Sequence, residues 1–77
     1  MDEATAIPIA QRSVATNDTE FGTNVSYRAR RDGPGWFVRA EVIVGTNDFG
    51  QPLTQVGGQR YIDIDERSGV THYIRGH

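Results

Sequence analysis

The chain has 77 residues, 36% of them hydrophobic and 23% charged, with a formal net charge of −2 at pH 7 and no cysteine. These values are typical of one small soluble domain, and they exclude a disulfide framework, a thiolate nucleophile and zinc sites that use sulfur ligands. A domain of this size buries only about 60% of the surface that its unfolded chain exposes, so its core must be thin.

No apolar run approaches the roughly 18 residues that a membrane helix needs. The first residues, MDEATAIPIAQRS, lack the basic start and the long apolar stretch of a secretory signal. We therefore expect a cytoplasmic protein with no membrane contact. Charge is spread unevenly, since residues 1–20 carry four acids and one arginine, whereas residues 21–45 carry four arginines and two acids. Every cationic side chain is arginine, which offers planar recognition with several donors.

A short amphipathic helix is predicted over residues 5–16, approximately. Ile7, Ala10 and Val14 recur at helical spacing, and the polar face begins with Gln11, Arg12 and Ser13. With Thr5 as the N-cap, Pro8 falls in the first turn, where its missing N–H costs no hydrogen bond. The alternative for this segment is an extended N-terminal arm. A connecting loop is then predicted from the turn-forming residues Asn17, Asp18, Gly22 and Asn24.

Residues 25–44 predict a hairpin in which VSYRARR and WFVRAEVIV are joined by DGPG. If Arg31 faces Trp36 across the turn, the apolar side chains of both strands gather on one face. The pairs that follow are Ala29 with Val38, Tyr27 with Ala40, and Val25 with Val42. The other face presents Ser26, Arg28, Arg30, Phe37, Arg39 and Glu41. This register sets Arg28 opposite Arg39, a repulsion that Glu41 or an external anion would relieve.

Residues 45–58 show no periodicity and are predicted to be a loop, and long loops in compact domains are usually functional or disordered. Asp48 and Phe49 in this loop form a second candidate contact surface. A last hairpin is predicted over residues 60–75, with a three-residue loop of Arg67, Ser68 and Gly69.

The three-residue loop sets Ile64 opposite His72 and Ile62 opposite Ile74, with Val70 on the same apolar face. His72 then points inward or lies at the edge of the core. The outer face of this hairpin would carry Tyr61, Asp63, Asp65, Thr71, Tyr73 and Arg75. The predicted fold is a single α+β domain over residues 1–77, with one N-terminal helix packed on a four-stranded antiparallel sheet made of two hairpins.

No pattern of reactive side chains points to catalysis. Asp63, Asp65 and Glu66 lie at a strand end and do not match a calcium loop, and His72 has no partner carboxylate that the sequence places beside it. No serine has the context of a nucleophile elbow. We therefore expect no catalytic residue, no metal ligand and no cofactor.

The outward side chains of the first hairpin are the most specific chemical feature. Arg28, Arg30 and Arg39 converge with Phe37 on one face, which suits phosphates and bases of a nucleic acid. The same residue types are enriched in protein interfaces. They also suit the solvated outer face of a half-exposed sheet.

The order of four motifs adds a family resemblance. A helix containing AIPIA is followed by RDGPGWFVRAEV, a glycine pair and YIDIDERSGVTHYIRGH. This order resembles small bacterial immunity proteins with a nuclear-transport-factor-like (cystatin-like) fold, from polymorphic toxin systems. It is similar also to PepSY-type domains, which share the helix and hairpin order.

The immunity-family resemblance implies a non-catalytic protein that binds and neutralises a cognate toxin stoichiometrically, without a cofactor. Two alternatives stay open: a small nucleic-acid-binding β protein that uses its arginine and aromatic side chains, and a structural or assembly subunit of a larger complex. An exposed edge strand in so small a sheet also permits a homodimer.

Overall fold

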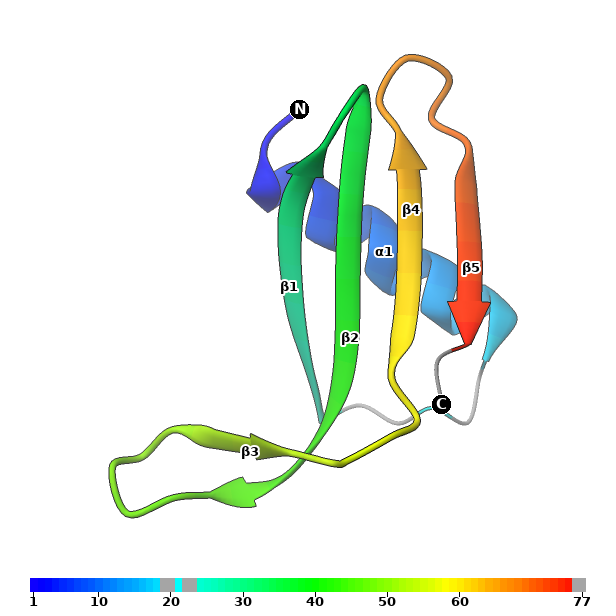
Figure 1. The fold of residues 1–77 in the computed structure, drawn as a ribbon. Helices are drawn as coiled ribbons and strands as arrows, with labels where there is room; N and C mark the ends of the chain where they lie inside the picture. Colours follow the sequence, from blue (N-terminus) through cyan, green and yellow to red (C-terminus); the bar gives the residue numbers. More distant parts are fainter. Residues whose placement is uncertain (19–20, 22–23, 76–77) are drawn as a thin grey trace.

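The computed structural model describes residues 1–18, 21 and 24–75. In chain order the elements are α1 (Glu3–Asn17), β1 (Val25–Asp32), β2 (Gly35–Thr46), β3 (Pro52–Thr54), β4 (Arg60–Asp65) and β5 (Thr71–Arg75). The helix crosses one face of an antiparallel sheet with the strand order β1-β2-β4-β5, and β3 pairs with the far end of β2 (Figure 1). The predicted α+β class, with an N-terminal helix packed on an antiparallel sheet, is confirmed. In the described part of the chain, no helix has the length and apolar character needed to cross a membrane.

The N-terminal segment is helical, and its cap is Asp2. The Asp2 carboxylate accepts hydrogen bonds from the backbone N–H of Thr5 at 3.0 Å and from the Thr5 hydroxyl at 2.9 Å. The prediction of Thr5 as N-cap is therefore wrong, because Asp2 caps the helix three residues further upstream. Pro8 consequently lies inside the helix and not in its first turn. Its ring is exposed, so water can satisfy the Ala4 carbonyl that residue 8 leaves without a donor.

The helix buries a narrow stripe against the sheet, made of Ala6, Ala10, Ser13 and Val14. Ser13 is only 8% exposed, so its predicted position on the polar face is wrong. Gln11 is exposed, as expected of the polar face. Of the predicted connecting loop, Gly22 lies outside the described residues.

The β1–β2 hairpin has the predicted register. Arg31 pairs with Trp36, Ala29 with Val38, Tyr27 with Ala40, and Val25 with Val42. A two-residue turn of Gly33 and Pro34 joins the strands, and Gly33 has the positive φ of 56° that this reversal requires. The period-two apolar pattern therefore predicted correctly which side chains face the helix.

The β4–β5 hairpin is displaced by one residue from the predicted register. Ile64 pairs with Thr71 and not with His72, while Tyr73 pairs with Ile62. Because successive strand residues point to opposite faces, this shift turns every β5 side chain over. Tyr73 packs against the core, Ile74 is 48% exposed, and His72 is exposed on the other face, which corrects the predicted inward position of His72.

The cause of this shift is the length of the loop. The backbone N–H of Asp65 donates to the Val70 carbonyl at 2.9 Å, so this pair encloses a loop of four residues, 66–69, where a loop of three was predicted. The Asp65 carboxylate accepts hydrogen bonds from the N–H groups of Arg67 and Ser68 at 2.9 and 3.1 Å and holds this longer turn. Gly69 has the predicted positive φ, at 74°.

The segment 45–58, predicted to be a loop, contains the strand β3. The strand β2 continues to Thr46, and Ile43, Gly45 and Thr46 pair with Thr54, Leu53 and Pro52. An irregularity between Ile43 and Gly45 bends the ribbon, so this second hairpin projects away from the main sheet (Figure 1). The prediction failed because this hairpin has no buried side and hence no alternating pattern.

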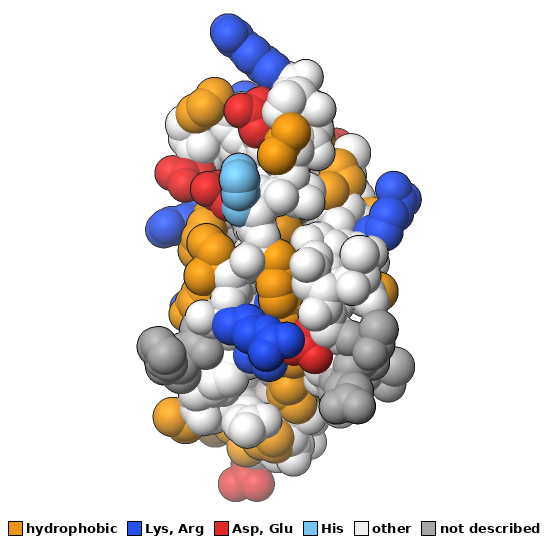
Figure 2. Space-filling model, turned by 90° about the vertical axis from the view of Figure 1, so that its right-hand side faces the viewer, with side chains coloured by type: hydrophobic (Ala, Val, Ile, Leu, Met, Phe, Trp, Pro, Cys, Tyr) orange, Lys and Arg blue, Asp and Glu red, His pale blue; other side chains and the backbone are white. Residues whose placement is uncertain are grey.

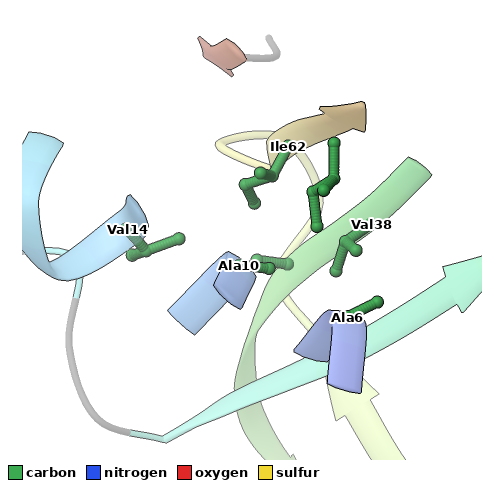
Figure 3. Close-up of a cluster of buried hydrophobic side chains, with 7 residues drawn as sticks. Ala6, Ala10, Val14, Val38 and Ile62 are labelled. Carbon is green, nitrogen blue, oxygen red and sulfur yellow. The ribbon is translucent and has the colours of Figure 1, made fainter. Parts of the chain in front are cut away.

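The core is small and lies between α1 and the two central strands. Val38, Ile62 and Ile64 are its largest fully buried side chains. Figure 3 shows Ala6, Ala10 and Val14 of the helix turned toward Val38 and Ile62. The sheet is covered by the helix on this face only.

Candidate functional site on the open sheet face

The sheet face opposite α1 has no covering layer in the described part of the chain, and we call it the open face. Its side chains come from the outward positions of four strands: Arg28 and Arg30 on β1, Phe37 and Arg39 on β2, Tyr61 and Asp63 on β4, His72 and Ile74 on β5. Strand register aligns these residues in two rows across the sheet. In Figure 1 this face is turned toward the viewer, with the helix behind the sheet. Figure 2, seen from the β5 side, shows the described histidine side chain at the surface.

An aromatic pair forms the centre of the open face. The rings of Phe37 and Tyr61 are stacked, with their centroids 5.5 Å apart and their planes at 23°. The guanidinium carbon of Arg30 lies 5.0 Å from the centre of the Phe37 ring. Offset stacking and a cation over a ring face are both favourable arrangements, so these three side chains hold one another in place.

A shallow depression of about 320 Å³ lies over this pair. Its walls are Arg28, Ala29, Arg30, Phe37, Arg39 and Tyr61. Four of the side chains singled out from the sequence, Arg28, Arg30, Phe37 and Arg39, thus line one concave surface. Tyr61 was placed on an outer face by its strand pattern, and the pairing of β2 with β4 brings it beside Phe37.

The arginines of this face differ in their partners. Arg39 forms an ion pair with Glu41, from its Nε to Oε1 at 3.2 Å, and the Thr54 hydroxyl donates to the same carboxylate at 3.2 Å. Glu41 therefore relieves the opposition of Arg28 and Arg39, as predicted. Within the described residues, Arg28 and Arg30 form no ion pair with a carboxylate. Their charge is available to a ligand.

Asp48 and Phe49 do not join this surface. Both lie in the turn between β2 and β3, at the end of the projecting hairpin, and neither lines the depression. Phe49 is 88% exposed, and its backbone N–H donates to the Asn47 side chain at 2.9 Å. The two candidate surfaces are therefore separate.

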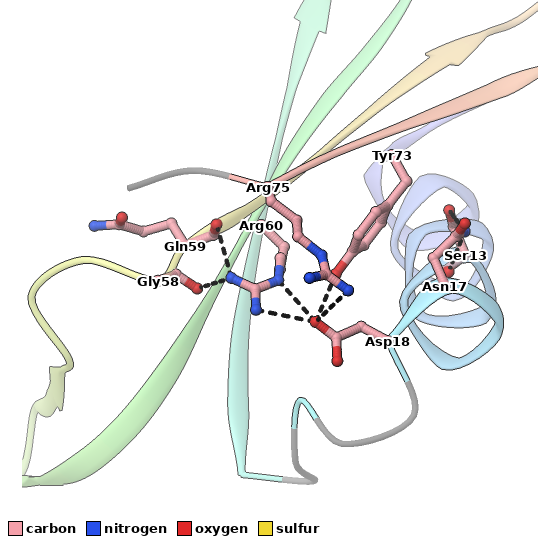
Figure 4. A network of polar contacts seen from close by, with 8 residues as sticks. All are labelled: Ser13, Asn17, Asp18, Gly58, Gln59, Arg60, Tyr73 and Arg75. Atoms are coloured by element: carbon pink, nitrogen blue, oxygen red, sulfur yellow. Dashed lines mark hydrogen bonds and ion pairs between the residues drawn. The ribbon is translucent and has the colours of Figure 1, made fainter.

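A polar cluster around Asp18 has no counterpart among the sequence-based candidates (Figure 4). Asp18 Oδ2 accepts from Arg60 Nε at 3.0 Å and from the Tyr73 hydroxyl at 3.3 Å, and Arg60 Nη2 lies 2.9 Å away. Arg75 Nη2 is 3.8 Å from the same oxygen. The hydrogen bond from Arg60 is the main cause that holds the pKa of Asp18 below its ordinary value.

The contacts of this cluster hold secondary-structure elements together. It ties the end of α1 to β4 and β5, and Arg60 also donates to the carbonyls of Gly58 and Gln59 and lies 4.7 Å over the Phe21 ring. Asp18 and Arg60 are 42 residues apart in the chain. The sequence offered no local signal for their contact. The predicted β5 register, displaced by one residue, also placed Tyr73 on the opposite face of the sheet.

Within the described residues, the acidic groups elsewhere do not assemble a metal site. Asp63, Asp65 and His72 line a second depression of about 360 Å³ near the β1–β2 turn. Among the residues with a described placement, no group of three His, Cys, Asp or Glu side chains is arranged to hold a metal ion.

Comparisons with protein-family models, with curated proteins and with solved structures give no match for this chain. The resemblance to immunity proteins therefore stays a prediction from the four motifs. What the fold and the open face define is a small α+β domain with a preorganised cationic and aromatic surface.

Proposed function

We propose that this chain is a non-catalytic binding protein, and that its open face contacts an acidic surface of a partner protein. The observation that carries the proposal is the position of Arg28 and Arg30, which form no ion pair within the described residues, beside the stacked rings of Phe37 and Tyr61. Arginine and aromatic residues are enriched at the centres of interfaces, where they contribute most of the binding energy. Because stacking already orders Arg30 and Phe37, binding immobilises fewer free side chains.

The partner class that we propose is a toxin, neutralised by stoichiometric binding. The motif order that resembles immunity proteins supports this class. Active sites that hold metal ions are rich in carboxylates, and a surface with unpaired arginines is complementary in charge to such a site. An inhibitor of this kind needs no reaction chemistry of its own.

A pair of matched variants tests the use of the open face. Arg28→Glu/Arg30→Glu and Arg12→Glu/Arg67→Glu each replace two exposed arginines that form no ion pair within the described residues. Each variant changes the net charge by −4, from −2 to −6, so global charge is matched. The first variant is expected to weaken partner binding at least about 100-fold, as loss and reversal of central interface charges does. Equal binding by the two variants would remove the open face from consideration.

A second candidate function is binding of single-stranded nucleic acid, and the Phe37–Tyr61 stack favours it. Exposed rings on a sheet face can stack with bases, while arginines contact phosphates. Affinity for an oligonucleotide would then fall by orders of magnitude between low and moderate salt, because counterions are released on binding. A protein complex retained after nuclease treatment separates the first function from the second.

A further inference from the structure

The hairpin of residues 44–58, which we call the arm, is a second surface with a different chemistry. It comprises the end of β2, the turn at 47–51, β3 and the residues that follow it. Figure 1 shows it projecting from the end of the main sheet, beyond the region covered by α1. Neither the core nor the open face includes any of its side chains.

The arm is internally ordered by its turn. Asn47 Oδ1 accepts from the backbone N–H groups of Phe49 and Gln51 at 2.9 and 3.0 Å, and Asn47 Nδ2 donates to Gln51 Oε1 at 3.0 Å. The backbone N–H of Asn47 donates to the Gln51 carbonyl at 2.9 Å, and Gly50 has a positive φ of 76°. The arm is thus preformed, and docking would require little further ordering.

The ordered arm exposes apolar side chains. Val44 is 64% exposed, Phe49 88%, Leu53 47% and Val56 98%. Over the same 15 residues, Asp48 is the single charged side chain. Four exposed apolar side chains with a single charge among them make the arm a candidate interaction surface.

We propose that the arm is a homodimerisation surface, and that its occupant is the arm of a second copy of this chain. In a two-fold dimer the same patch is used by both copies, so a patch with several charges of one sign repels its own copy. With one carboxylate in 15 residues, the arm can meet its own copy with little repulsion. The open face is less suited to self-association, because it would bring the Arg28, Arg30 and Arg39 side chains of two copies together.

The arms meet through side chains and not by extension of the sheet. Pro52 stands in β3 and has no N–H, which is a common device that blocks pairing at an edge strand. Antiparallel packing of two arms about Leu53, the middle residue of β3, brings Phe49 of each copy toward Val56 of the other. This dimer leaves both open faces exposed, so it does not depend on the proposed function of the open face.

Sedimentation equilibrium of the full chain, from micromolar to millimolar concentration, tests the proposal. The average mass is expected to rise with concentration toward twice the monomer mass of 8.5 kDa. Phe49→Ser/Val56→Ser is expected to raise the dimer Kd at least about tenfold, the effect of losing one interface anchor. Val70→Ser/Ile74→Ser is the matched control, because Val70 and Ile74 are 50% and 48% exposed and lie outside the arm.

A cross-linking measurement reports the contact itself, since the chain has no cysteine of its own. Leu53→Cys is expected to form a disulfide dimer faster than Ala15→Cys, which places the thiol on the exposed side of α1. Circular dichroism establishes that each variant is folded. A wild type that stays monomeric throughout, a Kd unchanged by the arm variant, or equal cross-linking rates would each overturn the proposal.

Discussion

Replacement of isoleucine by alanine should destabilise the protein much more at the buried Ile62 than at the half-exposed Ile74. Ile62 lies on β4 with no exposed surface, whereas Ile74, on β5, is 48% exposed on the open face. Ile62→Ala removes three carbon atoms from the core, which costs about 2.4 kcal/mol at ~0.8 kcal/mol for each buried carbon. The cavity left behind raises the loss to about 3 kcal/mol. Ile74→Ala should cost about 1.2 kcal/mol, because about half of its side chain already contacts water.

These losses are large relative to the stability of so small a protein. At roughly 0.05–0.15 kcal/mol per residue, a chain of 77 residues has a free energy of unfolding of about 4–12 kcal/mol. In a domain of this size each 1 kcal/mol shifts Tm by about 4–8 °C, so Ile62→Ala should lower Tm by about 12–24 °C. Urea and thermal unfolding, followed by circular dichroism and Trp36 fluorescence, give both quantities. Equal losses from the two variants would show that Ile74 is buried, and would refute the β5 register that places His72 and Ile74 on the open face.

Two further predictions concern backbone packing and pH. Gly35→Ala would place a Cβ 1.9 Å from the backbone oxygen of Ile64 and should cost about 1–3 kcal/mol or more, whereas Gly45→Ala, with nothing within 4 Å, should cost under about 0.5 kcal/mol in urea unfolding. Equal costs would contradict the close approach of β2 and β4. Because the hydrogen bond from Arg60 lowers the pKa of Asp18 beneath its ordinary value of 3.8, the stabilisation from Asp18 is present above that value and is lost as the pH falls through the folded-state pKa. Asp18→Asn should therefore lower Tm at pH 7 and make Tm decline less steeply with falling pH below about pH 4. A decline as steep as in the wild type would contradict stabilisation by the ionised Asp18 carboxylate.

The sequence was sufficient for the fold class and for one hairpin. The β1–β2 register followed from a pattern in which one face is apolar and the turn, DGPG, is short. The other hairpin was ambiguous, because Tyr73 and Ile74 are adjacent and either can face the core. A one-residue difference in loop length decides between them, and that length is held by hydrogen bonds to the Asp65 carboxylate.

The open face could be predicted in part, because the register of the β1–β2 hairpin was predicted correctly. Arg28, Arg30, Phe37 and Arg39 share one hairpin, so local register alone placed them together. Tyr61 required the pairing of β2 with β4, which joins the two hairpins and leaves no trace in either pattern.

The remaining misses were contacts or caps without a hydrophobic pattern. The Asp18–Arg60 contact spans 42 residues, the N-cap at Asp2 depends on local backbone geometry, and β3 has no buried side.

A capture experiment shows whether the open face binds a partner protein. Wild type, Arg28→Glu/Arg30→Glu and Arg12→Glu/Arg67→Glu are used as baits in nuclease-treated lysate of the source organism, and each captured polypeptide is identified and titrated against all three purified proteins. We predict one polypeptide bound in a 1:1 ratio by the wild type and the Arg12/Arg67 variant, with at least about 100-fold weaker binding by the Arg28/Arg30 variant. Equal affinity for the two double variants, or capture that nuclease treatment abolishes, would contradict it.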